Sequence, residues 1–294
     1  MQNDKHAVLW ALLTVVFWST ASTAFKIALR DLSPIQLLWV ASLTSTFVLM
    51  LSLIWQNKWS ALKAQSTAEL FRSLGLGILN PVAYYIVLFE AYSRLPAQMA
   101  QPLNYTWPLV LVFLSAIILK QQIHLKSYIA LIVSFVGVVI IASKGSFSGF
   151  AGVDILGVIL ASGSALIWAS FWLLNLRDKR DESVKLFMSF LAGSLVMTLI
   201  VFIHGDIRPM SFVGVGAGVY VGLFEMGFAF VFWQKAMQKA TSTDKISNLV
   251  FLSPFLALIF IAQILNETIL PSTFLGLVFI VGGIVIQKVR KVQI

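Results

Sequence analysis

The segment "LPAQMAQPLNYTWPLVLVFLSAIILKQQIHLKSYIALIVSFVGVVI" at residues 95–140 is informative about the fold, because a related segment occurs later in the chain. It aligns without a gap on residues 241–286, "TSTDKISNLVFLSPFLALIFIAQILNETILPSTFLGLVFIVGGIVI". Apolar segments match by chance more easily than polar ones, so shared prolines and glycines weigh most. The alignment pairs Pro108 with Pro254 and Gly137 with Gly283. The sequence therefore predicts two related halves.

Both segments belong to a chain of unusual composition. Of its 294 residues, 59% are hydrophobic and 11% are charged, and the mean hydropathy is +0.90. A soluble domain carries roughly 25% charged residues. The apolar residues form long blocks, and a helix needs about 20 of them to cross the hydrocarbon core of a bilayer. This composition predicts an all-α integral membrane protein.

Short polar connectors divide the chain into ten candidate membrane helices: 6–28, 33–55, 69–92, 96–119, 125–143, 152–176, 184–204, 210–235, 242–265 and 271–288. The basic residues test this count, because the cytoplasmic loops of membrane proteins carry an excess of Lys and Arg. With a cytoplasmic N-terminus, 16 of the 21 basic residues fall on the cytoplasmic side. The other five are Lys26, Arg30, Arg94, Lys144 and Arg208. The distribution predicts ten transmembrane helices with both termini in the cytoplasm.

Several function classes are excluded by what the sequence lacks. The formal net charge is +9, but the basic residues flank apolar blocks and form no continuous patch for nucleic acid. There is no cysteine, and the three histidines form no metal-ligand pair. No phosphate-binding loop or nucleophile–histidine pair is present. We therefore expect no metal, no cofactor and no enzyme activity.

Each half contains five spans, so the second half enters the membrane from the opposite side and the two repeats are inverted. We place the first five-helix repeat at 1–143, a polar connector at 144–151 and the second repeat at 152–294. Inverted repeats are typical of secondary transporters, whose substrate site lies at the repeat interface near the bilayer midplane.

Glu225 is the one acidic residue near the centre of a predicted span, in "GLFEMGFAFVFW" at 222–233. A carboxylate at that depth costs about 2.5–3.5 kcal/mol on insertion scales, so it normally faces a cavity or a partner. Gly218 and Gly222 lie on its face of the helix. We predict that Glu225 lines a cavity and binds a substrate amine or exchanges a proton. The alternative is a protonated carboxyl group that hydrogen-bonds a neighbouring helix.

The repeat places Asn80 at the position equivalent to Glu225, with Tyr84 one turn further along the same face. Pro81 follows Asn80 and removes a backbone hydrogen bond, which can kink the helix. We predict Asn80 and Tyr84 as cavity residues and Pro81 as a hinge. Packing bonds between helices are the alternative role for the two polar side chains.

Tryptophans and small hydroxyls share faces in the first and sixth spans. Trp18 and Ser22 lie on one face of the first, and Trp168 and Trp172 repeat the pattern in the sixth. Such a wall suits an organic solute with apolar and polar parts. Ordinary packing is the alternative, because Ser can bond to its own helix carbonyls.

The fourth and ninth spans carry the remaining candidates. Gln101, Tyr105 and Pro108 follow one face of the fourth span, and the ninth offers Asn248 and Pro254 near the equivalent depth. We predict that Gln101, Tyr105 and Asn248 bind substrate. Pro108 and Pro254 are predicted hinges for alternating access.

Two five-span repeats, with "NYTWPLV" and "VFLSPFL" opening the fourth span of each, make the chain resemble the drug/metabolite transporter superfamily and its EamA-type permeases. The resemblance covers almost the whole chain. It implies a central cavity lined by spans 1, 3, 4, 6, 8 and 9, with spans 5 and 10 at the periphery. Members of similar size export amino acids, including aromatic ones, or other metabolites.

We therefore predict a secondary transporter that exports small organic metabolites, foremost amino acids with aromatic or hydrophobic side chains, by alternating access. A second hypothesis is a proton-coupled exporter of drugs or other cations. The third, a membrane-embedded enzyme or scaffold, lacks the clustered polar residues that an enzyme needs. The expected partners are a small metabolite, the lipid bilayer and, in the second hypothesis, protons. The expected location is a bacterial cytoplasmic (inner) membrane, where one chain could work as a monomer.

Overall fold

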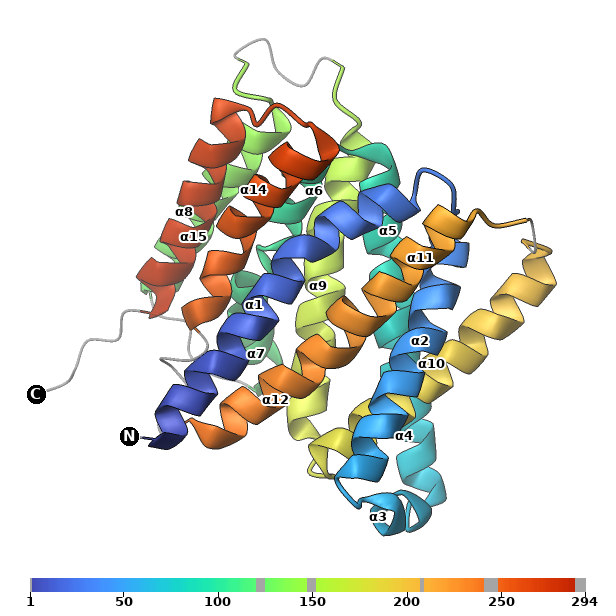
Figure 1. Ribbon diagram of the computed structural model, residues 1–294. Coiled ribbons are helices and arrows are strands. Elements are labelled where there is room, and N and C mark those ends of the chain that lie inside the picture. Colours follow the sequence, from blue (N-terminus) through green and yellow to red (C-terminus); the bar gives the residue numbers. More distant parts are fainter. Residues whose placement is uncertain (1, 120–124, 147–151, 207–208, 241–247, 289–294) are drawn as a thin grey trace, which may run out of the picture.

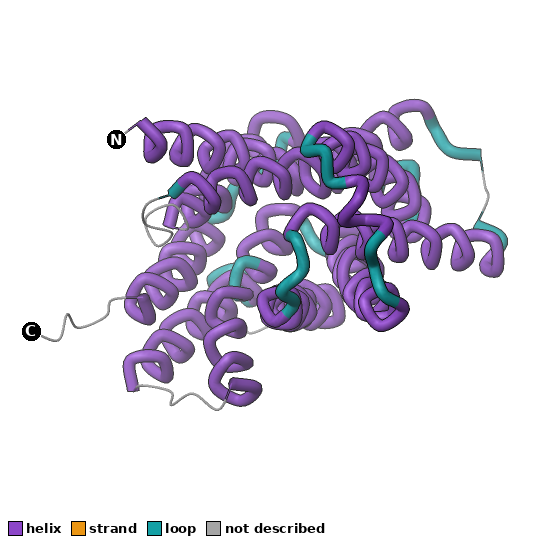
Figure 2. Tube along the Cα trace, turned by 90° about the horizontal axis from the view of Figure 1, so that it is seen from below, coloured by secondary structure: helices purple, strands orange, loops and turns teal. Residues whose placement is uncertain are grey.

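The computed structural model describes residues 2–119, 125–146, 152–206, 209–240 and 248–288. Figures 1 and 2 show a bundle of helices joined by short loops, with no strand among these residues. Six helical segments of the described chain are long and apolar enough to cross a membrane: Lys5–Ala28, Pro34–Trp55, Thr67–Arg94, Ile155–Arg177, Glu182–His204 and Phe212–Lys239. The predicted all-α membrane fold is confirmed, and the count of ten spans stays a prediction.

The first half of the chain contributes these helices: α1 (Gln2–Ala28), α2 (Pro34–Trp55), α3 (Trp59–Lys63), α4 (Thr67–Gly77), η1 (Ile78–Ala83), α5 (Tyr84–Arg94), α6 (Ala97–Asn104), α7 (Trp107–Leu119) and α8 (Leu125–Ala142). The second half contributes α9 (Ile155–Arg177), α10 (Glu182–His204), α11 (Phe212–Tyr220), η2 (Val221–Phe228), α12 (Ala229–Lys239), η3 (Leu249–Leu252), α14 (Ser253–Leu265) and α15 (Pro271–Lys288).

Serine and aspartate side chains fix where several of these helices begin. Ser33 caps α2, and Gln36 closes the reciprocal bond, with Pro34 supplying a first residue that needs no amide partner. Ser66 forms the same capping box with Glu69 at the start of α4. These capping residues fix where the helices begin, which the apolar blocks of the sequence alone do not determine.

The predicted span at 96–119 is interrupted. Helix α6 ends at Asn104 and α7 begins at Trp107, with a turn between them. Pro108 has no amide hydrogen and so favours the start of a new helix over the continuation of α6. The start of the predicted span at 242–265 lies outside the described residues.

The third span of each half contains a π-helical segment, η1 in the first and η2 in the second. Helix η1 is broken: Asn80 has extended backbone angles of φ −147° and ψ 117°, and the Asn80–Pro81 peptide is cis. Helix η2 continues smoothly into α12. The two halves therefore differ in backbone at the level of Asn80 and Glu225.

Equivalent loops of the two halves pack at opposite ends of the bundle (Figure 1). At one end, Ser33 and Ser211 donate hydrogen bonds to Asp206 and Asp31, which ties the α1–α2 loop to α10 and α11. At the other end, the loop between α9 and α10 packs on α4, where Arg180 Nη1 donates to Ser73 Oγ at 2.9 Å. The same junction is thus built twice, in opposite directions.

The second of these loops contains a buried ion pair. The Asp178 side chain is fully buried, and Arg180 Nη2 lies 2.6 Å from its Oδ2 atom. Burial by itself would raise the pKa of the Asp178 carboxyl, but the hydrogen bonds and charge of Arg180 outweigh it and hold the pKa below its ordinary value. This charge pair clamps the loop onto α4.

Helices α8 and α15 lie side by side at one edge of the bundle, at the left of Figure 1, and pack chiefly on each other. Gly137 of α8 faces the backbone of Gly276, and Gly283 of α15 faces Ala130 and Ser134. A Cβ atom on Gly283 would lie 2.1 Å from Ser134 Oγ and 2.6 Å from the Ala130 carbonyl oxygen. Glycine is needed at this seam because the two backbones approach so closely.

Candidate functional site

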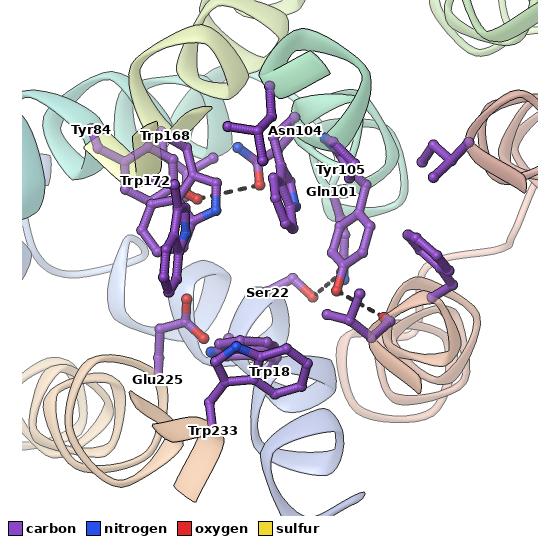
Figure 3. Close-up of a pocket in the computed structure, with 18 of the residues that line it drawn as sticks. Trp18, Ser22, Tyr84, Gln101, Asn104, Tyr105, Trp168, Trp172, Glu225 and Trp233 are labelled. Carbon is purple, nitrogen blue, oxygen red and sulfur yellow. Dashed lines mark hydrogen bonds between the residues drawn. The ribbon is translucent and has the colours of Figure 1, made fainter. Parts of the chain in front are cut away.

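A cavity of about 360 Å³ lies between the two halves of the bundle (Figure 3). Residues from α1, α5, α6, α7 and α9 line it, together with residues from η2, α12 and η3. Helix α15, expected at the periphery, contributes Ile284. The volume falls within the range of roughly 300–1,000 Å³ that is usual for small-molecule sites.

Of the 21 described residues that line the cavity, ten are aromatic. Trp18 of α1 and Trp233 of α12 lie with their ring centroids 5.4 Å apart. On the side contributed by α9, Trp168 packs on Tyr84 at 4.6 Å and edge-on against Trp172 at 5.9 Å. Each ring is held by another ring, so the wall is rigid and apolar.

Glu225 brings the one carboxyl group among the cavity-lining residues. Figure 3 shows it facing the space bounded by the labelled tryptophans. Its Oε1 atom accepts a hydrogen bond of 3.1 Å from the Tyr85 hydroxyl. Its Oε2 atom has no hydrogen-bond partner among the described residues. One oxygen is thus held by the protein, and the other is buried without a partner among the described residues.

Amides and hydroxyls continue the wall beside α6. Ser22 Oγ donates to Gln101 Oε1 at 2.6 Å, and Tyr105 Oη donates to the Val250 carbonyl oxygen at 3.3 Å. Asn104 accepts from the Tyr84 hydroxyl at 3.3 Å. These neutral groups add donors and acceptors without adding charge.

Most of the residues predicted from sequence come together at this cavity. Its lining includes Trp18, Ser22, Tyr84, Gln101, Tyr105, Pro108, Trp168, Trp172 and Glu225. Four predicted residues do not line it. Asn248 is exposed at the start of η3, and Pro254 is buried near the start of α14. Asn80 and Pro81 are buried in η1, which packs against α10.

The break in η1 explains why Asn80 lies elsewhere. The repeat placed Asn80 and Glu225 on equivalent faces of continuous helices, but the backbone of Asn80 is extended. Its side chain is fully buried, and neither amide atom has a partner among the described residues. The predicted symmetry of acid and amide across one cavity is therefore absent from this structure.

Sequence reasoning did not single out Trp107, Trp233, Phe25 or Tyr92, which also line the cavity. Trp233 follows Glu225 by eight residues, which on an ordinary α-helix places it about 80° from the Glu225 direction, at the edge of the same face. The π-helical turns of η2 change that phase. The spacing of eight residues is therefore a sequence signal that could have placed Trp233 near the Glu225 face.

A polar cluster surrounds the start of α6, the helix that brings Gln101 and Asn104 to the cavity. Gln98 Nε2 donates to the Thr268 carbonyl oxygen at 2.9 Å, and Gln98 Oε1 accepts from Leu270 N at 2.9 Å and from Thr273 Oγ1 at 3.1 Å. Glu267 accepts from the first two amides of α6, Ala97 N at 3.0 Å and Gln98 N at 3.2 Å. We call Gln98, Glu267, Thr268, Leu270 and Thr273 the α6 latch.

The α6 latch joins the first half of the chain to the loop between α14 and α15. Cavity residues nearest to it are buried, with Ser22 exposed by 1% and Tyr92 by 2%. Trp107 and Trp233, toward the end where α1 begins, are only partly buried. The cavity-lining residues on the latch side are therefore more buried than Trp107 and Trp233.

The described residues contain no cluster of three or more His, Cys, Asp or Glu side chains that could hold a metal ion. The lining offers one carboxyl group, neutral donors and aromatic faces. Such a site can bind and orient an organic solute. Its position between the two halves of a membrane bundle is typical of one class: multi-pass membrane transporters for small molecules.

Comparison with known proteins agrees with that class. The model of the EamA-like transporter family matches residues 5–143 and again residues 155–287. The chain belongs to this family, and the predicted resemblance is confirmed. A solved crystal structure superposes with a TM-score of 0.66 at 20% identity, covering 96% of both chains, which shows a shared fold.

Two relatives illustrate the range of likeness. An uncharacterized transporter of Archaeoglobus fulgidus is 26% identical over 99% of this chain and 100% of its own. An aromatic amino acid exporter of Ancylobacter novellus is 27% identical over 58% of this chain and 64% of its own. Transporters thus match along the whole length, which points to transport rather than enzyme chemistry.

Proposed function

We propose that this transporter exports amino acids, foremost those with aromatic or hydrophobic side chains. The observation that carries the proposal is the free Oε2 atom of Glu225 in a cavity walled by tryptophans. A carboxylate in a site of low polarity binds an ammonium group through charge-assisted hydrogen bonds. Every amino acid presents such a group.

The aromatic wall suits the side chain of the substrate. Trp18 and Trp233 lie on one side of the cavity and Trp168 and Trp172 on the other (Figure 3). A ring between them would gain burial and offset or edge-on contacts, worth about 0.5–1.5 kcal/mol per aromatic pair beyond burial. A small hydrophilic side chain gains neither. The aromatic amino acid exporter among the relatives supports this choice.

Neutral donors remain for the substrate carboxylate. Trp172 lines the cavity, and its indole N–H has no hydrogen-bond partner among the described residues. A substrate carboxylate would supply the acceptor that this buried donor lacks. Glu225 and Trp172 then mark the two poles of a zwitterion.

Alternating access would move the solute. In the proposed cycle, the α6 latch shuts one end of the cavity, and an export step requires that end to open while the other closes. Pro81, Pro108 and Pro254 stay our predicted hinges; Pro81 follows the backbone break, and Pro108 and Pro254 stand near the starts of α7 and α14. We place the protein in a bacterial cytoplasmic membrane with both termini in the cytoplasm.

Counterflow in proteoliposomes tests the proposal. Labelled phenylalanine should accumulate in wild-type vesicles preloaded with unlabelled amino acid, and Glu225→Gln should reduce the rate by at least about tenfold, as expected for the loss of a charge-assisted hydrogen bond. Glu90→Gln is the matched control, because Glu90 pairs with Arg94 and does not line the cavity. Equal rates in wild-type protein and Glu225→Gln would refute the proposed role of Glu225.

A proton-coupled exporter of organic cations is the second candidate, favoured by a specific feature of the site. Among the described residues that line the cavity, Glu225 is the only charged side chain, and no Lys, Arg or His faces a substrate carboxylate. In vesicles with an imposed pH gradient, this candidate predicts that phenethylamine accumulates and phenylalanine does not. The amino acid proposal predicts the reverse preference.

A further inference from the structure

Tyr85 lies beside the cavity and contacts Glu225, which carries the one carboxyl group among the described residues that line it. It belongs to α5 in the first half of the chain, and its side chain is completely buried. It does not line the cavity. Among the described residues, its hydroxyl donates the one hydrogen bond to the Glu225 side chain, at 3.1 Å to Oε1. Tyr85 therefore touches the site through Glu225 alone.

Aromatic packing holds the Tyr85 ring independently of that hydrogen bond. The ring meets Tyr84 in an edge-on contact at 4.6 Å between centroids and packs on Phe89 at 5.3 Å. Because the ring is fixed on both sides, its hydroxyl is a fixed point toward which the carboxyl group of Glu225 turns. Removing only the hydroxyl should leave this packing in place.

A carboxyl group has two oxygens and can rotate about its last bond. The hydrogen bond from Tyr85 selects one rotation, in which Oε1 faces the protein and Oε2 is left without a protein partner. Without the bond, the plane of the carboxyl group could turn about its last bond and the group would lose its fixed aim. An ordered acceptor binds an ammonium group more tightly than a disordered one, because less freedom is lost on binding.

We propose that Tyr85 is a positioning residue that aims the Glu225 carboxylate at the amino group of the transported solute. This inference rests on the proposed function for the nature of the solute, but the aim of the carboxyl group can be measured without any solute. The bond also joins the two halves of the chain at the centre of the site. Its donor comes from the first repeat and its acceptor from the second.

Tyr85→Phe is the test variant, because it removes one oxygen and keeps the ring. Hydrogen bonds to charged groups contribute about 1.5–3 kcal/mol, so we expect the Kd for phenylalanine to rise about tenfold. N-acetylphenylalanine amide has the same side chain and no ammonium group, and its Kd should change less than about twofold. Tyr220→Phe is the matched control. The Tyr220 hydroxyl forms a hydrogen bond of 2.7 Å with the Thr20 hydroxyl, and neither residue lines the cavity.

A double-mutant cycle separates positioning from general damage. In the Glu225→Gln background, Tyr85→Phe should change the Kd for phenylalanine by less than about twofold, because the group that it aims is gone. Equal losses for the charged and neutral ligands, or full additivity with Glu225→Gln, would overturn the inference.

Infrared difference spectroscopy on the protein without solute supplies the independent readout. The carboxyl band of Glu225, identified by its loss in Glu225→Gln, should shift in Tyr85→Phe and stay in place in Tyr220→Phe. An unshifted band would refute the role of Tyr85 whatever the protein transports. If the band shifts but wild-type protein binds no amino acid, the proposed function fails and the contact between Tyr85 and Glu225 stands.

Discussion

Replacing Gln98 with alanine should open the end of the cavity that the α6 latch closes in the proposed cycle. The Gln98 side chain is buried and makes three hydrogen bonds to the second half of the chain, at 2.9, 2.9 and 3.1 Å. Alanine keeps the helix and removes all three. The backbone bonds from α6 to Glu267 remain, so the variant weakens the latch without deleting it.

The size of the effect follows from the three bonds. Each contributes a net of about 0.5–1.5 kcal/mol, and the Leu270 amide loses its acceptor in the variant. A total of about 2–4 kcal/mol in favour of the open state is therefore expected. Such a change shifts the ratio of open to closed protein by roughly 30- to 700-fold.

Cysteine labelling measures this ratio with little background, because the chain contains no cysteine. Ser22 lines the cavity near the latch and is buried, so Ser22→Cys reports whether that end is open. A maleimide that cannot cross the membrane, added from the latch side, should label Ser22→Cys slowly. The double variant with Gln98→Ala should react at least about 30-fold faster, provided that opening limits the labelling rate.

Thr268→Ala provides the control for the latch. Gln98 bonds the backbone carbonyl of Thr268, so removal of the Thr268 side chain should leave the labelling rate of Ser22→Cys unchanged. An unchanged rate in a correctly folded Gln98→Ala variant would show that the latch does not hold this end closed. Acceleration by Thr268→Ala of the same size would show that any change in the loop has this effect.

Three further predictions concern other parts of the molecule. Gly283→Ala should force α8 and α15 apart and destabilise the protein by about 1–3 kcal/mol. Gly282→Ala should not, because a Cβ atom there meets nothing within 4 Å. Thermal unfolding in detergent compares the two variants. The pKa of Asp178 is lowered in the folded protein, so its ion pair stabilises the fold at pH values above the ordinary Asp pKa of about 4. This stabilisation is lost as the pH falls through the folded-state pKa. The Tm of wild-type protein should therefore exceed that of Asp178→Asn at about pH 7, and the difference should vanish on acidification toward about pH 3. Trp172→Phe removes the free indole N–H and should weaken binding of phenylalanine about tenfold but that of phenethylamine less than twofold by calorimetry.

The membrane fold could be predicted because its signals are long and redundant. A helix that crosses a bilayer must be apolar along its whole length, and that demand is visible without knowledge of neighbouring helices. The site was predictable where helices are regular: α1 carries Trp18 and Ser22 to the cavity, and α9 carries Trp168 and Trp172. A regular helix keeps its phase, so spacing along the sequence reports direction in space.

Prediction failed where the backbone leaves that regular path. Asn80, with its extended backbone, is not among the cavity-lining residues, and η2 alters the helical phase between Glu225 and Trp233. The α6 latch could not be predicted for another reason. Gln98 and Glu267 stand 169 residues apart in sequence, and only the folded chain brings them together.

The seam between α8 and α15 is related to itself by the internal repeat. The alignment of the two halves carries Gly137 onto Gly283 and Ala130 onto Gly276. The contact between Gly137 and Gly276 is therefore equivalent to the contact between Gly283 and Ala130. Exchanging the conformations of the two halves leaves an interface of this kind unchanged. In alternating access, α8 and α15 would stay fixed relative to each other, and the helices that surround Glu225 would move.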